Sequence, residues 1–286
     1  MTTALLSTLL MNSLVTGLVY ALFASGLTLV FGVMSIVLFC HGAVYMLGSY
    51  TFYHLFRTWE LNYLLSIILT MAATGCLGLI LERFFFKKVE YAILPSLFVA
   101  AGLTMIIEQS AMLGFGTLPR SVHSPFVGII KVLGGIVSVE RLAVMGIAIG
   151  FIVLLMLSLD HTKTGRAIRA VSQDVQVASS FGINPTYMYA GSCFIGCVMA
   201  GAAGALMAPI YGLSYSMGEP WLMKGFMIII IGGLGSIPGS VIGGLILGVI
   251  ESFGMFYFGY LSSSFIFIAV MIILILRPKG LMGHAD

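Results

Sequence analysis

The chain has 286 residues, of which 60% are hydrophobic and only 8% are charged. Ordinary soluble domains carry about 25% charged residues, so the 13 basic and 10 acidic side chains cannot cover the surface of a water-soluble protein of this length. The composition therefore excludes a soluble enzyme and predicts a polytopic membrane protein.

Long apolar segments follow one another from the N-terminus to residue 276. Backbone groups inside a bilayer must be paired within the protein, which leaves helices or a closed barrel, and these runs are too long and too uniform for barrel strands. We predict an all-α, sheet-free fold over residues 1–286, with about 8–10 transmembrane helices that include broken or half helices. The expected crossings are residues 8–32, 41–56, 61–81, 92–113, 141–159, 185–209, two within 219–258, and 260–276.

Basic residues give these helices an orientation. No Lys or Arg precedes the first run, so we expect a retained helix and not a cleaved signal peptide. By the positive-inside rule three basic groups face the cytoplasm: Arg83 with Lys87 and Lys88, Lys163 with Arg166 and Arg169, and Arg277 with Lys279. Three further basic residues then fall on the outer side, against the rule: Arg120, Lys131 and Arg141.

A glycine-containing pattern occurs twice. Residues Gly32–Ile36 and Gly233–Ile237 share the spacing G-x-x-S-I at an offset of 201 residues, and at the same offset Gly17 matches Gly218 and Gly42 matches Gly243. Paired broken helices in an internal repeat are common in transporters and line their pathways. Chance similarity among 35 glycines is the alternative.

The segment from Asp160 to Pro185 is too polar to cross a bilayer and has helical periodicity. One face carries Arg166, Arg169, Gln173, Gln176 and Ser180, and the other carries Ile168, Val171, Val175 and Ala178. Gly182 is typical of a left-handed helix stop, and Asn184-Pro185 is typical of a new helix start. Two interpretations stay open: a helix that rests in the lipid headgroups, or a docking element for a cytoplasmic partner.

Polar side chains within the apolar segments are candidates for a pathway, because such groups are costly at membrane depth unless they are paired or functional. The candidates are His41, Glu108, Ser236 and Glu251, together with Gly233 in the second glycine-containing break. For His41 and Glu108 a structural hydrogen bond is the alternative. Glu219 and Lys224 flank Trp221, where they could pair with each other or meet an external protein.

Catalytic and metal chemistry find little support. Ser25 with His41 offers a nucleophile and a base, but no third partner or oxyanion motif accompanies them. The four cysteines lie in apolar runs and are expected to be small buried side chains. Cys193 and Cys197 have no His or carboxylate beside them, so we assign no metal and no cofactor.

Five motifs in order make the chain resemble the permease subunits of high-affinity branched-chain amino acid ABC transporters, specifically the shorter of their two permease types. The motifs are Phe39-Cys40-His41-Gly42, Glu82-Arg83, Arg169 to Pro185, Gly232 to Gly239, and Arg277-Pro278-Lys279-Gly280-Leu281. Two positions depart from the family pattern, because Leu38 stands where an Asn is usual and Cys40 where a small Ala is usual. Since relatives of this group also carry urea, short amides and other carboxylates, the resemblance leaves the substrate open.

The resemblance implies a binding-protein-dependent importer of branched-chain or other hydrophobic amino acids in the inner or plasma membrane of a prokaryote, with urea or a short amide as the alternative cargo. Its partners would be a second permease in a heterodimer, two cytoplasmic ATPases, an extracytoplasmic solute-binding protein and membrane lipid, with no nucleic acid. The 166–182 segment would be the cytoplasmic coupling helix, with Arg166, Arg169, Gln173, Gln176, Ala178 and Gly182 as its ATPase-coupling residues. No phosphate loop G-x-x-x-x-G-K-[ST] occurs in the sequence, so the ATPase must be a separate subunit. An ion-coupled secondary transporter is the alternative of a different class.

Overall fold

The computed structural model describes residues 3–132, 135–277 and 280–282, and it confirms an all-α, multi-pass architecture. In this part of the chain six helices are long and apolar enough to cross a membrane. They are α1 (Thr3–Met34), α3 (Tyr63–Leu81), α4 (Ile93–Phe115), α5 (Val139–His161), α8 (Pro185–Tyr211) and α10 (Ile237–Phe258).

Three predicted crossings are short helices. They are α2 (His41–Tyr53), which continues as a π-helical turn over His54–Thr58, α9 (Gly218–Gly232) and α11 (Ser262–Leu276). A helix of 15 residues, such as α9, is about 22 Å long and falls short of the ~30 Å hydrocarbon layer. All nine expected segments are therefore helical, and the broken or half helices are α2, α9 and α11.

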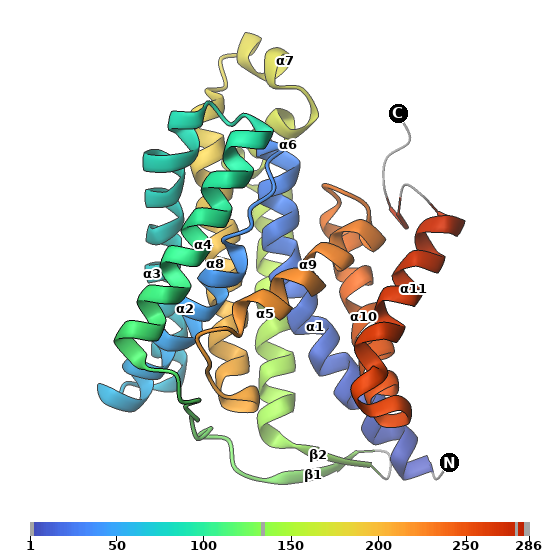
Figure 1. Cartoon of the computed structure of the whole chain (residues 1–286). Coiled ribbons are helices and arrows are strands. Elements are labelled where there is room, and N and C mark those ends of the chain that lie inside the picture. The colour runs from blue at the N-terminus through green and yellow to red at the C-terminus, as the bar shows by residue number, and fades with distance from the viewer. Residues whose placement is uncertain (1–2, 133–134, 278–279, 283–286) are drawn as a thin grey trace.

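The prediction of a chain without sheets is wrong at one place. Strands β1 (Ile129–Val132) and β2 (Gly135–Ser138) form an antiparallel hairpin in which Ile129 lies opposite Ser138. The hairpin lies beside the N-terminus at one end of the bundle (Figure 1), where the Ile136 N–H donates to Thr8 Oγ1 at 3.1 Å. Outside the hydrocarbon layer water can pair with open strand edges, so the rule against sheets does not apply there.

Helices α1 and α8 form the centre of the bundle, and most of their surface is buried by the other helices. Glycines allow the close approach. A Cβ atom placed on Gly48 of α2 would lie 2.6 Å from the Cα of Gly201 of α8, and one placed on Gly26 of α1 would lie 2.7 Å from the carbonyl oxygen of Gly196. Small residues let membrane helices pack backbone to backbone, which explains why α8 is rich in Gly and Ala.

The two glycine patterns lie against each other. A Cβ on Gly32 would lie 3.2 Å from the Cα of Gly235. The packing is reciprocal, because Gly42 meets Gly218 while Gly17 meets Gly244 and Leu245, next to Gly243. If each glycine is replaced by its equivalent 201 residues away, the Gly42–Gly218 contact becomes a contact between Gly243 and Gly17, which lies within two residues of the observed one. This agreement supports an internal repeat over chance similarity.

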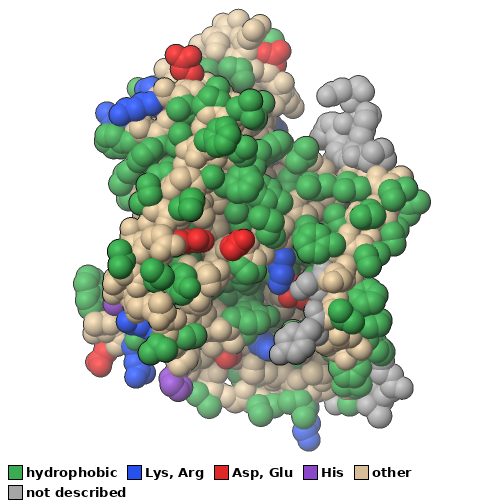
Figure 2. Space-filling view, in the orientation of Figure 1, with side chains coloured by type: hydrophobic (Ala, Val, Ile, Leu, Met, Phe, Trp, Pro, Cys, Tyr) green, Lys and Arg blue, Asp and Glu red, His purple; other side chains and the backbone are tan. Residues whose placement is uncertain are grey.

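Charged residues collect at the two ends of the molecule. The turns η2 (Glu82–Phe86) and η3 (Lys87–Val89) lie at the same end as α6 (Lys163–Gln173) and α7 (Val175–Ser180), opposite the hairpin (Figure 1). The surface between the ends is largely hydrophobic, with a few charged side chains at mid-height (Figure 2). Lys279 lies outside the described residues.

The side chain of Cys76 is exposed on the surface of the protein, in contrast to the expectation that all four cysteines are buried.

Candidate functional site

A cavity of about 230 Å³ lies between α2, α4 and α9. Its walls are mostly apolar, and two carboxylates, Glu108 of α4 and Glu219 of α9, stand among them. The lining residues are Phe39, Gly42, Ala43, Ala101, Thr104, Met105, Glu108, Gly218, Glu219, Leu222 and Met223.

The two carboxylates in the cavity have different surroundings. Glu219 lies in the first turn of α9, where the helix dipole stabilises a negative charge. Glu108 lies in the second half of α4, and its Oε1 finds no hydrogen-bond partner among the described residues. An apolar cavity with two negative groups can hold a small ligand that combines an aliphatic body with a positive charge.

A second polar cluster joins three helices behind the cavity wall. The Lys224 ammonium of α9 donates to Glu251 Oε1 of α10 and to the Tyr20 hydroxyl of α1, each at 2.6 Å. The Tyr20 hydroxyl donates in turn to Glu251 Oε2 at 2.6 Å. The possible pairing of Glu219 with Lys224 is therefore not formed. Five residues turn an α-helix by roughly 140° beyond a full turn, so these two side chains point to different sides of α9.

Aromatic rings pack against α9 beside this cluster. Trp221 stacks on Tyr45 of α2, with ring centroids 4.4 Å apart, and meets the edges of Tyr20 and Phe23 of α1 at 4.8 and 6.1 Å. Trp221 is thus buried in the core and Lys224 turns toward Tyr20 and Glu251, while Glu219, Leu222 and Met223 line the cavity. Helix α9 is the wall between them.

His41 lies at the first residue of α2 and is fully buried. Its Nε2 is 3.3 Å from the carbonyl oxygen of Phe23, and its Nδ1 has no partner among the described residues. The neighbouring Gly42 and Ala43 line the cavity, whereas His41 does not. The Ser25 hydroxyl donates to Leu22 O instead of His41, so no nucleophile–base pair forms.

Gly233 and Ser236 form the turn between α9 and α10. Gly233 has a φ of 101°, and the Ser236 hydroxyl caps α10 by accepting the Gly239 N–H at 3.2 Å. The C-terminal tail covers this turn, because the N–H groups of Leu281 and Met282 donate to the carbonyl oxygens of Ile231 and Gly232. Two of the five sequence motifs meet here, and neither Gly233 nor Ser236 lines the cavity.

The polar segment between α5 and α8, at the end of the molecule opposite the hairpin, consists of the two helices α6 and α7. The prediction of one helix over 166–182 is wrong. The break is at Asp174, whose Oδ1 accepts the N–H groups of Gln176 and Val177 at 2.8 and 2.9 Å and so begins α7. A short acidic side chain caps a helix start better than it continues a helix. An Asp before an apolar residue is a start signal that could have been recognised in the sequence.

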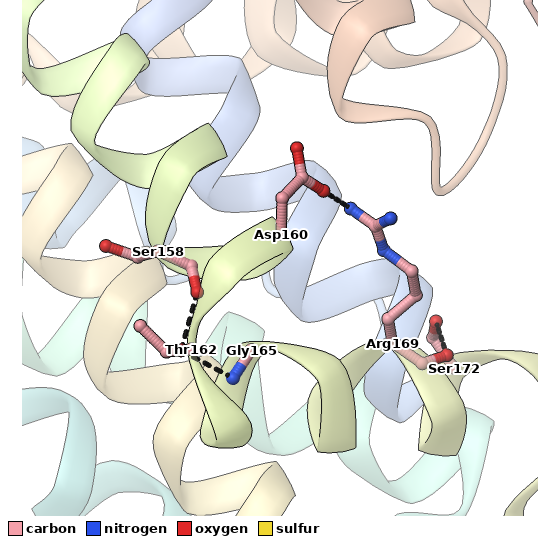
Figure 3. Close-up of polar contacts among 6 residues, drawn as sticks. All are labelled: Ser158, Asp160, Thr162, Gly165, Arg169 and Ser172. Atoms are coloured by element: carbon pink, nitrogen blue, oxygen red, sulfur yellow. Dashed lines mark hydrogen bonds and ion pairs between the residues drawn. The ribbon is translucent and has the colours of Figure 1, made fainter.

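The two faces of this segment are as predicted, except at one residue. Ile168, Val171 and Ala178 are buried, while Val175 is 37% exposed. Arg166, Arg169, Gln173, Gln176 and Ser180 are exposed. Arg169 pairs with Asp160 at the end of α5 (Figure 3).

Both ends of the α6–α7 segment are joined to the neighbouring long helices through capped turns. Thr162 Oγ1 accepts the Gly165 N–H at 2.9 Å and caps α6 (Figure 3). At the other end Gly182 has a φ of 81°, and the N–H groups of Ile183 and Gly182 donate to the carbonyl oxygens of Ala178 and Ser179. This is the double hydrogen bond of a Schellman stop. Asn184 and Pro185 then begin α8 as predicted.

A partly buried hydrogen bond at the same end involves Glu82 of the Glu82-Arg83 motif. The Tyr91 hydroxyl donates to Glu82 Oε1 at 2.5 Å and ties the turn before α4 to the end of α3. Burial, with this hydrogen bond, raises the pKa of the Tyr91 phenol above its ordinary value, so the phenol stays protonated and keeps donating.

The comparisons with known proteins cover almost the whole chain. Residues 9–276 match the family model described as "Branched-chain amino acid transport system / permease component". The chain is 30% identical to the high-affinity branched-chain amino acid transport system permease protein BraD of Pseudomonas aeruginosa, over 97% of this chain and 95% of BraD. It is also 30% identical to LivH of Escherichia coli, over 96% and 94% of the two chains. The solved structure of PsaBC from Streptococcus pneumoniae in complex with Fab is 12% identical, with a TM-score of 0.47, 93% of this chain and 89% of that one being covered.

Proposed function

Since the chain belongs to the family of permease components of branched-chain amino acid transport systems, we propose that it carries branched-chain amino acids inward as the membrane subunit of an ABC importer. The family is one of transport permeases, so the chain is a transport subunit and not an enzyme. The observation that carries the proposal is the match over residues 9–276. The matches to BraD and LivH cover nearly the full length of those proteins, and their names as branched-chain amino acid permeases support branched-chain amino acids as the cargo.

The cavity between α2, α4 and α9 is our candidate for part of the substrate pathway. Its apolar walls suit an aliphatic side chain, and Glu108 and Glu219 suit an ammonium group. Urea and short amides carry no positive charge, so the acidic pair favours an amino acid over these alternatives. Of the other candidates, His41 and Glu251 do not line the cavity, and Gly233 and Ser236 form the turn at the end of α9.

The α6–α7 segment is our candidate for ATPase docking, with Arg166, Gln173 and Gln176 exposed on it. Its tight joints to α5 and α8 support this role, because a pull on the segment would move both membrane helices as rigid bodies. This end is then cytoplasmic, in agreement with its basic residues. A solute-binding protein would dock at the hairpin end, and a second permease would complete the pathway.

The function is tested with the chain, its candidate partner permease, ATPases and binding protein reconstituted in liposomes. We expect uptake of radiolabelled leucine, isoleucine or valine that requires the binding protein and ATP and continues when an uncoupler collapses the proton gradient. Uptake by this chain alone that the uncoupler abolishes would instead establish an ion-coupled secondary transporter.

The role of the cavity is tested by removing its charges. Glu108→Gln and Glu219→Gln are each expected to lower the rate of leucine transport at saturating loaded binding protein by roughly tenfold, since a charge-assisted hydrogen bond contributes about 1.5 kcal/mol. Glu60→Gln removes an exposed carboxylate away from the cavity and is the matched control. Unchanged transport in both cavity variants would exclude the cavity from the pathway.

A further inference from the structure

The ring formed by Lys224, Tyr20 and Glu251 is a closed polar network at membrane depth. Each of its three hydrogen bonds is 2.6 Å long, and each side chain comes from a different helix. The Lys and Glu side chains are only about a quarter exposed. Tyr20 lies near the middle of α1 and Glu251 in the second half of α10, so the network crosses the bundle well inside the apolar region.

Each member of the ring compensates another. Lys224 and Glu251 cancel in charge, and the Tyr20 hydroxyl both accepts from the ammonium and donates to the carboxylate. Loss of one charged member leaves the other ion unpaired at membrane depth, which is strongly unfavourable. Loss of both charges leaves no unpaired ion, yet it also removes the directional link between α9 and its neighbours. These two consequences can be separated by experiment.

Helix α9 is short, and its position depends on side contacts. Its N-terminal Gly218 packs on Gly42, and its last carbonyl groups accept from the tail at Leu281 and Met282. Between these ends the ring holds Lys224, the residue that directly follows the cavity-lining Leu222 and Met223. A shift of α9 therefore moves Glu219 and both apolar side chains, and with them one wall of the cavity.

We propose that Lys224, Tyr20 and Glu251 are positioning residues for transport: their hydrogen-bonded ring sets the position of α9 and thereby the shape of the cavity wall. They act on the substrate only through α9. This inference rests on the proposed function insofar as the cavity serves transport, but the position of α9 can be measured without any substrate.

The test uses the complete reconstituted transporter with two readouts. The first is the number of ATP molecules hydrolysed per amino acid transported. The second is the rate at which a small polar thiol reagent labels a cysteine placed at position 223 by Met223→Cys. Met223 is 41% exposed. The background is Cys76→Ser, which removes the exposed native thiol. For Glu251→Gln and Lys224→Met we expect the number of ATP molecules hydrolysed per amino acid transported to rise by about tenfold or more, with a severalfold change in labelling. Tyr20→Phe should give a smaller change in the same direction.

The double variant Lys224→Met/Glu251→Gln separates positioning from simple charge compensation. We expect it to assemble in wild-type amounts and still show altered labelling and more ATP used per amino acid, while the exchange Lys224→Glu/Glu251→Lys restores both readouts in part. Lys131→Met, which removes a cation at the hairpin, is the control. A double variant with wild-type coupling and labelling would overturn the proposal, as would single variants with both readouts unchanged. If wild-type protein moves no amino acid, the proposed function fails, whereas the labelling result still decides the position of α9.

Discussion

Replacing Arg166 by Glu is expected to uncouple the permease from its ATPases while leaving it folded in the membrane. Arg166 lies on the exposed face of α6, and the described residues include no ion partner for it. Charge reversal in a docking surface places like charges together, which costs several kcal/mol. A loss of about 2–3 kcal/mol corresponds to a roughly 30- to 140-fold weaker complex. Co-purification with the ATPases and transport by the reconstituted complex measure the effect.

Arg166 is a cleaner probe than Arg169. Because Arg169 pairs with Asp160, Arg169→Glu would bring two carboxylates together within the chain and disturb the joint between α5 and α6 itself. Lys131→Glu at the opposite end is the matched control for the reversal of one exposed charge, and it should retain ATPase binding. If the Arg166→Glu complex keeps wild-type stoichiometry and transport, α6 does not contact the ATPases.

The second large effect is expected for Gly48→Ala in α2. The added Cβ would lie 2.6 Å from the Cα and 2.9 Å from the carbonyl oxygen of Gly201. Neither group can turn aside, because both belong to the backbone of α8. The two helices must separate, at a cost of about 1–3 kcal/mol for overpacking. We expect a lower midpoint of thermal unfolding for the purified protein in detergent and a smaller yield of folded permease.

Gly102→Ala in α4 is the matched control, since nothing lies within 4 Å of a Cβ at that position. The same substitution there should be neutral or stabilising by up to about 1 kcal/mol, because Ala is the better helix former. Gly48→Ala is thus expected to lower the midpoint, whereas Gly102→Ala should leave it unchanged or raise it. Equal midpoints would contradict the close approach of α2 and α8.

Most of the architecture could be predicted from the sequence, because the length of an apolar run is itself the structural signal in a bilayer. All nine expected segments are helices, with ends close to those predicted. Local cap chemistry also held, as at Gly182 and Asn184. The hairpin at Ile129–Ser138 was missed because residues outside the hydrocarbon layer are free of the constraint on which the prediction rested. The break at Asp174 departs from the predicted single helix because the Asp side chain caps a new helix start, which a regular periodic pattern does not reveal.

The candidate site was predictable only residue by residue. Glu108 and Glu251 stand out in the sequence as carboxylates in apolar helices, but their partners do not. Glu108 shares a cavity with Glu219, 111 positions further along the chain, and Glu251 bonds to Tyr20, 231 positions away. Lys224 had a nearby acidic residue in Glu219, yet the turn of α9 directs it to Glu251 instead.

The sequence by itself determined that this chain is a membrane protein, which segments are helical, and which family it belongs to, since these follow from composition, run length and local motifs. Only the tertiary structure decided that α9 separates a cavity from an ionic ring. The faces that helices turn toward one another depend on packing between segments some 200 residues apart, here through the glycine contacts Gly42–Gly218 and Gly32–Gly235. Periodicity within one helix carries no record of such contacts, because it describes only that helix's own surface.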